Sequence, residues 1–223
     1  PLWLAANPQI ASPEPTFSYN GIGDSLKVSI TIKNTGEATL QNPVYITVYK
    51  NSIQPSNAKT YTYPHSITPG ESKTIDFSIK NAKVWFGTNN NINFIIRIND
   101  KGNGFNDQPV CDSSKVELTI PFKDILYARN DTVTAKYNST YTFNVLKNDQ
   151  RGRCINSSMT KIDTIAQNGL RLGKIVINAD STFSYIANQN QFGIDSVDYY
   201  IKCGTDSSFA RVYIFLPKPQ SSS

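Results

Sequence analysis

Short runs in which apolar and polar residues alternate constrain the fold of this chain more than any other feature. A period of two is the pattern of a β-strand with one buried and one exposed face. In the first half the runs lie at residues 26–34, 44–50, 73–79, 92–98 and 116–120. In the second half they lie at residues 141–146, 161–166, 173–178, 182–187, 195–202 and 209–216. Because no helical spacing of apolar residues continues for three turns, the pattern predicts an all-β fold.

The alternation also predicts the core of the first half. Residues 80–87 allow one helical turn at most, so the interior should come from the strands. The apolar members of the five runs are Leu26, Val28, Ile30 and Ile32; Val44, Ile46 and Val48; Ile75, Phe77 and Ile79; Ile92, Phe94, Ile96 and Ile98; and Val116, Leu118 and Ile120.

The length of 223 residues is enough for two domains of about 100 residues each. Short strands joined by turns, without helices, are typical of β-sandwiches, so we predict two tandem Ig-like β-sandwich domains. The expected ranges are 1–121 for the first, 122–217 for the second and 218–223 for a disordered tail. The short linker after Pro121 predicts limited bending. The ends, PLWLAANPQ and PKPQSSS, are typical of a fragment of a longer protein, which we expect this chain to be.

The formal net charge of +5 raises the question of nucleic-acid binding. Residues 1–121 contain ten Lys and Arg against nine Asp and Glu, and residues 122–223 contain twelve against eight. The densest basic group is Lys147, Arg151 and Arg153, without an aromatic-rich RNA-binding motif beside it. We therefore interpret the excess as a solvated basic face and predict no nucleic-acid partner. Since no apolar run reaches about 18 residues, we also predict no direct membrane insertion.

The second half contains a series of motifs in a fixed order. They are ARND at 128–131, VLKND at 145–149, GKIVI at 173–177, DSTFSYI at 180–186 and FGIDSVDYYI at 192–201. In order and spacing, residues 125–216 resemble the Ig-like, cadherin-like tandem repeats of bacterial surface proteins. The glycine usual between Phe and Asp is displaced to Gly193, so the local turn departs from the pattern. The resemblance implies an exported β-sandwich.

The first half contains VSITIKNTGEA at 28–38, ITPGES at 67–72 and INDKGNGFNDQPVCDSS at 98–114. These segments resemble the cell-adhesion-related β-sandwich known as the CARDB domain. That family usually ends with an acidic, Asn-rich turn, and the turn here has fewer acidic residues. The resemblance implies an adhesion-related domain ahead of the Ig-like one.

His65, in YPHSITPG, is the only histidine, and it lies in a predicted loop, where catalytic residues are common. A hydrolase triad would bring it together with an acid and a hydroxyl group. The sequence has no G-x-S-x-G or H-E-x-x-H motif and no phosphate-binding loop. We therefore predict no catalytic residues and no enzymatic activity, and keep a hydrolase as the hypothesis that a cleft around His65 would favour.

Asn-Asp pairs at 130–131 and 148–149, with Asp195 and Asp206, offer the oxygen ligands that Ca²⁺ prefers, and repeats of the kind resembled can bind it. The alternative is that each side chain accepts backbone N–H bonds and ends a strand, as in Asx turns. No window of the sequence supplies the roughly six to eight oxygens that Ca²⁺ takes. We favour caps, and predict no metal site and no cofactor.

Cys111, Cys154 and Cys203 are the cysteines of the chain. In an exported protein an odd number predicts one disulfide and one spare thiol, or a partner outside this sequence. Cys154 follows the VLKND turn and Cys203 ends a predicted strand, so both can lie at one end of the second sandwich. We pair these two, with Cα atoms within about 7 Å, and leave Cys111 unpaired. Three reduced thiols are the alternative, and without a C-x-x-C motif they predict no metal site.

Tyr45, Tyr49, Tyr61 and Tyr63 are candidate binding residues, because exposed aromatic faces can form a platform for a sugar or a protein. The alternation places Tyr45 and Tyr49 on the face opposite Val44, beside residues 60–64, which we expect to form a loop. Cross-strand packing is the commoner role of such residues, and we favour it.

Together these features predict a non-catalytic spacer, stalk or adhesion module of an exported bacterial protein, located outside the cell or at its surface. Its partners would be neighbouring domains of a larger surface protein, and a host or environmental protein or glycan. The alternative function is a carbohydrate-binding accessory module, which exposed and coplanar aromatic residues would favour.

Overall fold

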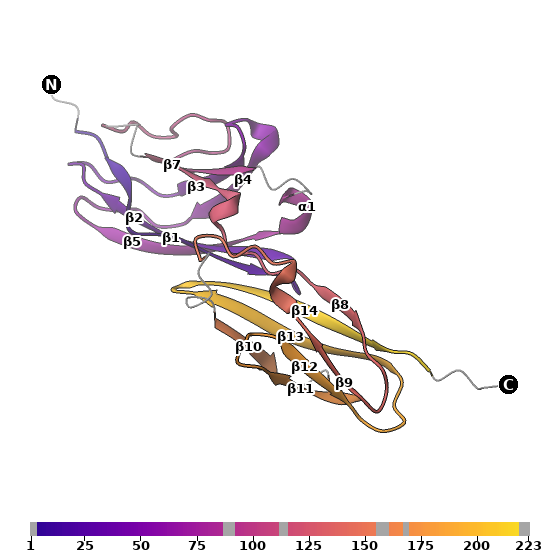
Figure 1. Ribbon diagram of the computed structural model, residues 1–223. Coiled ribbons are helices and arrows are strands. Elements are labelled where there is room, and N and C mark those ends of the chain that lie inside the picture. The colour runs from indigo at the N-terminus through magenta and orange to yellow at the C-terminus, as the bar shows by residue number, and fades with distance from the viewer. Residues whose placement is uncertain (1–3, 87–91, 112–115, 155–160, 167–169, 219–223) are drawn as a thin grey trace. The chain divides into compact units, whose positions relative to one another are not determined.

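The computed structural model describes residues 4–86, 92–111, 116–154, 161–166 and 170–218 (Figure 1). Its strands are β1 (Pro8–Asn20), β2 (Ser25–Asn34), β3 (Val44–Lys50), β4 (Ala58–Tyr63), β5 (Ser72–Lys80), β6 (Asn93–Ile98), β7 (Glu117–Pro121), β8 (Asp131–Thr134), β9 (Thr140–Phe143), β10 (Lys161–Ala166), β11 (Gly173–Ile177), β12 (Phe183–Ala187), β13 (Gly193–Cys203) and β14 (Asp206–Leu216). The helical elements are α1 (Ala82–Phe86) and the 3-10 turns η1 (Pro55–Asn57), η3 (Phe122–Asp124) and η4 (Val145–Lys147). The predicted all-β class is confirmed. Within these described residues, no helix is long and apolar enough to span a membrane.

The chain forms two compact units. The first contains the described residues up to Phe17 together with Leu26–Asp124, and the second contains Ser18–Ser25 together with the described residues from Ile125 onward. The end of β1 and the turn after it therefore belong to the second unit, which the alternation did not predict. The ranges predicted for the two domains, 1–121 and 122–217, stay a prediction.

The first unit has two sheets. One contains β1, β2 and β5 as successive neighbours, and the other has the order β4-β3-β6-β7. Ile46 of β3 lies opposite both Tyr61 of β4 and Ile98 of β6. Every residue that the alternation assigned to the interior is buried except Leu118, which is half-buried. Each such Leu, Ile or Val contributes about 1.5–3 kcal/mol through its removal from water.

Two strands of this unit lie where the alternation predicted none. β1 contains Pro8, Pro13 and Pro15, which signal a loop in a sequence. In this unit β1 is the edge of its sheet, where proline is tolerated because one side of the strand needs no ladder partner. β4 occupies most of residues 60–64, so the prediction of a loop there was wrong. It is also an edge strand, and none of its side chains is fully buried, so its apolar signal is weak.

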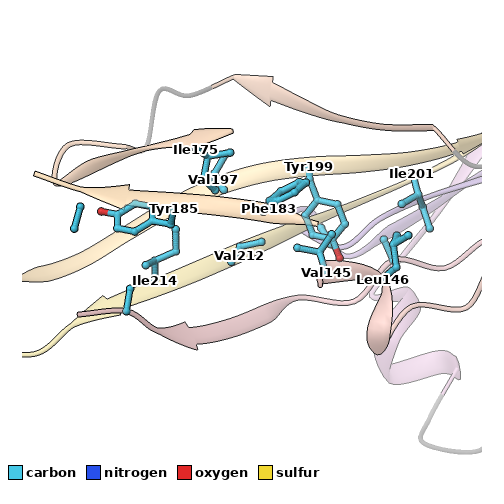
Figure 2. Close-up of a cluster of buried hydrophobic side chains, with 14 of the residues drawn as sticks. Val145, Leu146, Ile175, Phe183, Tyr185, Val197, Tyr199, Ile201, Val212 and Ile214 are labelled. Carbon is cyan, nitrogen blue, oxygen red and sulfur yellow. The ribbon is translucent and has the colours of Figure 1, made fainter. Parts of the chain in front are cut away.

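The second unit also has two sheets. β10, β13 and β14 are neighbours in one, β8 pairs with β14 in parallel, and the other sheet has the order β11-β12-β9. Figure 2 shows the core between them, where side chains of β12, β13 and β14 meet those of the η4 turn. The Phe183 and Tyr199 rings pack edge to face with centroids 5.9 Å apart. The strand predicted at 141–146 ends at Phe143, because the chain turns into η4.

Candidate functional site

The two Asn-Asp pairs of the second unit converge on the hydroxyl group of Tyr199 in β13. This oxygen lies 3.1 Å from Asp131 Oδ2, 3.1 Å from Asp149 Oδ2 and 3.0 Å from the carbonyl oxygen of Arg129. Tyr199 is fully buried, and Figure 2 shows its hydroxyl group on the side of Val145. Since one O–H can donate to one acceptor at a time, the two carboxylates share it. We call Asp131 and Asp149 the carboxylate pair.

The local sequence explains how the VLKND segment turns. Asn144 Oδ1 accepts a hydrogen bond of 2.8 Å from the Leu146 N–H, which caps the η4 turn at its start. The turn buries Val145 and Leu146, so the apolar half of the motif anchors it in the core. The strand therefore ends because an Asn cap and two core residues make a different local structure more stable.

The second half of the motif joins this turn to ARND. Asp149 Oδ1 accepts a hydrogen bond of 2.7 Å from the Arg129 N–H, and Asn148 Nδ2 donates to the Asn130 carbonyl oxygen at 3.2 Å. The side chains of Asn148 and Asp149 thus hold the two chain segments together through backbone groups of residues 129 and 130. This is the capping role, extended from one turn to a neighbouring segment.

Burial raises the pKa of Asp131 to about 6 and the pKa of Asp149 to about 7. The hydrogen bond from the Arg129 N–H acts in the opposite direction on the pKa of Asp149, while the negative charge of Asp131 raises that pKa further. The hydrogen bond from Tyr199 lowers the pKa of both carboxyl groups. Two coupled carboxyl groups with raised pKa values titrate as a pair near neutral pH.

The carboxylate pair and the Arg129 carbonyl oxygen are atoms of the kind that bind Ca²⁺, which takes about six to eight oxygens. Among the residues that the structure describes, no group of three or more His, Cys, Asp or Glu could hold a metal ion. The carboxylate oxygens instead accept hydrogen bonds from the Arg129 N–H and the Tyr199 hydroxyl group. These hydrogen bonds favour a capping role for the two aspartates, and the absence of a metal stays a prediction.

Asp195 has a similar role at the start of β13. It is buried, and accepts hydrogen bonds of 2.7 Å from the Arg171 N–H, 3.0 Å from the Leu172 N–H and 2.7 Å from the Tyr185 hydroxyl group. A Cβ atom at Gly173 would lie 2.5 Å from the Tyr185 ring and hydroxyl oxygen. The glycine of the GKIVI motif therefore leaves room for a tyrosine that the aspartate of the IDSV motif holds in place.

The first unit contains a buried carboxylate that the sequence analysis missed. Asp100 is fully buried, and its two oxygens lie 2.8 and 2.9 Å from the Tyr49 hydroxyl group. The N–H groups of residues 102–104 donate to Asp100 Oδ1 at 2.8–3.2 Å, and Arg97 Nε lies 3.5 Å from Oδ2. Burial and the neighbouring Asp100 raise the pKa of Tyr49 to about 12. The arrangement is an anion held by amides and a cation.

This geometry corrects the predicted set of binding tyrosines. Tyr49 lies on the predicted face of β3, but it is fully buried there by its contacts with Asp100 and Gly104, so it is not available to a ligand at the surface. Tyr45, on the same face, is half-buried, and Lys101 Nζ lies 5.1 Å from the centre of its ring. Binding by Tyr45 stays a prediction.

Tyr61 and Tyr63 of β4 lie opposite Ile46 and Val44, so they share the core-facing side of the sheet instead of the side of Tyr45. The Tyr61 ring stacks on Phe77 of β5 at 5.1 Å, and the Tyr63 ring meets the exposed His65 edge to face at 5.3 Å. The four tyrosines therefore do not form one platform. Binding by Tyr61 and Tyr63 individually stays a prediction.

An open groove of about 340 Å³ follows the edge strands β4 and β5. Its lining includes Lys59, Tyr61, Phe77, Lys80 and Asn81. The stacked pair of Tyr61 and Phe77 gives the groove an aromatic wall, and the lysines give it positive charge. Of the predicted binding residues, Tyr61 thus lines this groove.

Cys154 and Cys203 form a disulfide, with Cα atoms 6.2 Å apart and a sequence separation of 49. Cys203 ends β13, opposite Asp206 at the start of β14, and Cys154 is buried. Cys111 is a free, exposed cysteine whose Sγ lies 3.4 Å from the Ala5 carbonyl oxygen. The bond closes the sheet of the second unit onto the segment that follows the VLKND turn.

Residues 106–214 match the model of a protein family described as the bacterial Ig domain. This stretch of the chain is similar to bacterial Ig domains. The predicted resemblance to bacterial Ig-like repeats is confirmed, and the Ig domain contains the carboxylate pair, Asp195 and the disulfide. A comparison with curated protein sequences found no match.

Solved structures that align with parts or all of this chain include the following three. The CARDB domain of a Pyrococcus furiosus protein, in complex with di-metal ions, is 14% identical, with 53% of this chain and 93% of that chain covered and a TM-score of 0.36. A Listeria innocua β-glucosidase in complex with glucose is 16% identical, with 52% of this chain and 15% of that chain covered and a TM-score of 0.30. A chimeric titin Z1Z2 is 8% identical, with 98% and 100% covered and a TM-score of 0.28. At these scores we draw no conclusion from them.

Sequence reasoning missed the tyrosine partners of the carboxylates, although a signal for them exists. In β13 the inward positions are Asp195, Val197, Tyr199 and Ile201, so two polar residues occur in an otherwise apolar set. A polar side chain at an inward position needs a buried hydrogen-bond partner. This rule predicts a buried acceptor for the Tyr199 hydroxyl group. The Asn-Asp turns of the motifs contain carboxylates that can accept its hydrogen bond.

Proposed function

We propose that this chain is a non-catalytic spacer or adhesion module of an exported bacterial surface protein. The observation that supports this most directly is the use of three carboxylates that lie wholly or partly in the interior. Asp100, Asp149 and Asp195 each accept hydrogen bonds from backbone N–H groups and from a tyrosine hydroxyl group of their own unit. The polar residues that could perform chemistry thus stabilise the fold.

The bacterial Ig domain and the disulfide support a location outside the cell. Disulfides form and persist in oxidising compartments, and are rare in reducing cytosol. The partners we propose are neighbouring domains of a larger surface protein, and a host or environmental protein or glycan. Ig-like folds occur with many functions, so the site and not the fold has to decide between spacer and binding roles.

Labelling of cells tests the location. Antibodies against the chain should label intact cells of the native host as strongly as permeabilised cells, because the epitope would lie outside. Labelling that appears only after permeabilisation would contradict export. The spacer role is tested in the parent protein by replacing the chain with two unrelated β-sandwiches of equal length, which should preserve adhesion of the cells.

The groove beside Tyr61 favours one alternative, a carbohydrate-binding accessory module, because a stacked aromatic wall suits a sugar ring. A glycan array separates the two functions. A spacer should show no signal above background. Binding that Tyr61→Ala abolishes, and that the matched variant Tyr213→Ala of an exposed tyrosine in β14 preserves, would establish the alternative.

A further inference from the structure

The edge of β14 that faces away from β13 is closed by two separate chain segments. β13 pairs with β14 along its whole length, so the strands that pair with β14 in parallel must share the other edge. β8 lies along Val212–Phe215, and residues 18–20 lie along Ser207–Phe209. Between them, Asn130 Oδ1 accepts a hydrogen bond of 2.9 Å from the Arg211 N–H. All these residues belong to the second unit, whose sheet edge is therefore complete only with residues 18–20.

Residues 18–20 lie outside the range 106–214 that matches the bacterial Ig domain. The domain pattern thus leaves the start of β14 without a partner on this side. An open strand edge presents unpaired N–H and C=O groups, which are a template for pairing with another strand. Residues 18–20 satisfy that template.

Side chains as well as main-chain groups hold residues 18–20 against β14. Ser208 is fully buried, and its Oγ accepts from the Ala128 N–H at 2.7 Å and donates to the Tyr19 carbonyl oxygen at 3.1 Å. The Tyr19 side chain is 2% exposed, and its ring centre lies 4.4 Å from that of Tyr127. One serine therefore holds three chain segments together, and the tyrosine fills a buried position beside them.

Gly21 ends the segment for a steric reason. Its N–H donates a hydrogen bond of 2.7 Å to the Phe209 carbonyl oxygen. A Cβ atom at this position would lie 2.8 Å from the same oxygen, closer than van der Waals contact allows. Asn20 Oδ1 then accepts from the N–H groups of Ile22 and Gly23, which turns the chain away from β14.

We propose that this edge is a docking site for an extended Ser-Tyr-Asn-Gly segment, which residues 18–21 fill within one molecule and the same residues of a second copy of this chain can fill. Strand addition obtains affinity from main-chain hydrogen bonds and specificity from side-chain positions, here those of Tyr19 and Ser208. The occupant belongs to the chain itself, so exchange between two copies remakes every contact and is a low-cost route to a dimer.

Cysteine pairs in the full chain test the occupant. Ser18 Oγ and Ser207 Oγ lie 2.8 Å apart, so Ser18→Cys with Ser207→Cys should form a disulfide within the monomer. Cys111→Ser in the same chain removes the free thiol. The control is Ser18→Cys with Ser196→Cys, since Ser196 lies opposite Tyr213, about 20 Å along β14 from Ser207 at the usual rise per residue. Peptide mapping that finds no link between positions 18 and 207, or as much link in the control, would overturn the docking site.

Mixing two single variants tests the second copy. Ser18→Cys and Ser207→Cys chains, both with Cys111→Ser, are combined at high concentration, partially unfolded, refolded and oxidised. We expect a mixed dimer linked between positions 18 and 207, at least about tenfold above a mixture of Ser18→Cys and Ser196→Cys chains. A yield equal to that control would overturn strand exchange, whether or not the monomer cross-link forms.

Discussion

Both units bury a tyrosine hydroxyl group against carboxylate oxygens, but they compensate the buried charge differently. In the first unit Asp100 faces Tyr49, the N–H groups of residues 102–104 and the Arg97 guanidinium group. In the second unit Tyr199 lies between two carboxyl groups, whose burial raises their pKa values to about 6 and 7.

This difference predicts which perturbation should lower the stability of each unit. A carboxylate held by amides and a cation depends on its whole set of partners, because removal of the charge leaves several donors unsatisfied in the interior. A carboxyl pair around one hydroxyl group depends instead on proton binding, because its two members repel each other when both are ionised. The second unit also contains the disulfide, so a reductant is expected to act on this unit.

The largest effect should come from the disulfide. Reduction of Cys154–Cys203 should lower the free energy of unfolding of the second unit by about 4 kcal/mol, given a sequence separation of 49, because the open unfolded chain gains conformational entropy. The first unit should barely change. Hydrogen exchange followed peptide by peptide, with and without reductant, distinguishes the units, and Cys111→Ser is the control. Mass spectrometry that finds Cys111 joined to either other cysteine would contradict the pairing.

A smaller effect is expected in the first unit. Asp100→Asn should lower its free energy of unfolding by about 3 kcal/mol, because the neutral amide leaves Arg97 and the amides of residues 102–104 poorly paired in the interior. Urea denaturation measures the loss. Asp107→Asn is the matched control, since the ion pair of Asp107 with Lys101 is partly exposed and contributes less than about 1 kcal/mol. Equal losses in the two variants would remove the special role of Asp100.

The pH dependence of stability should come from the carboxylate pair. The folded-state pKa of Asp149 is raised to about 7, so the folded protein binds more protons than the unfolded one between about pH 4 and 7. Stability should therefore fall as pH rises through this window, by on the order of 2 kcal/mol. Asp149→Asn keeps an acceptor for the Arg129 N–H and should flatten the profile. Denaturation at pH 5 and pH 8 compares the variants, and an unchanged slope would show that the pair is not the source.

The smallest of the stability effects concerns the hydroxyl groups. Tyr199→Phe should cost about 1–2 kcal/mol, and more at pH 8 than at pH 5, because the Tyr199 hydrogen bond favours the ionised carboxylates. Tyr49→Phe is the matched variant of the first unit, where the hydroxyl group donates to Asp100 and accepts from the Gly104 N–H. The cost of Tyr49→Phe should vary less over the same pH range. A reversed order would contradict the assignment of the titrating groups to the second unit.

The alternation predicted the all-β class and the interior of the first unit because apolar residues occupy every second position of a strand, on the side that faces the core. It failed at β1, where three prolines concealed a strand that is at a sheet edge only within the first unit, and at β4, whose side chains contact the core only in part. Edge strands need fewer apolar residues, so their pattern is weak.

The candidate sites were harder to predict for a different reason. The Asn-Asp motifs showed that turns follow the strands, but their carboxylates meet Tyr199, which is 50 residues from Asp149 in the sequence. The alternation placed Tyr49 on the correct face, yet the contacts of Asp100 and Gly104 that bury it depend on the path of a loop. Likewise, nothing local indicates that Ser18 lies beside Ser207, 189 residues away.

We propose that the polar residues of the Ig motifs stabilise the fold and bind no ligand. The melting temperature of the full chain with and without millimolar Ca²⁺ tests this, because only a ligand that binds the native state raises stability. Asp149→Ala and the matched variant Asp180→Ala, in an exposed turn, are measured beside it. We expect the melting temperature to stay the same on addition of Ca²⁺ to any of the three proteins. A rise of several degrees that Asp149→Ala abolishes and Asp180→Ala preserves would contradict it.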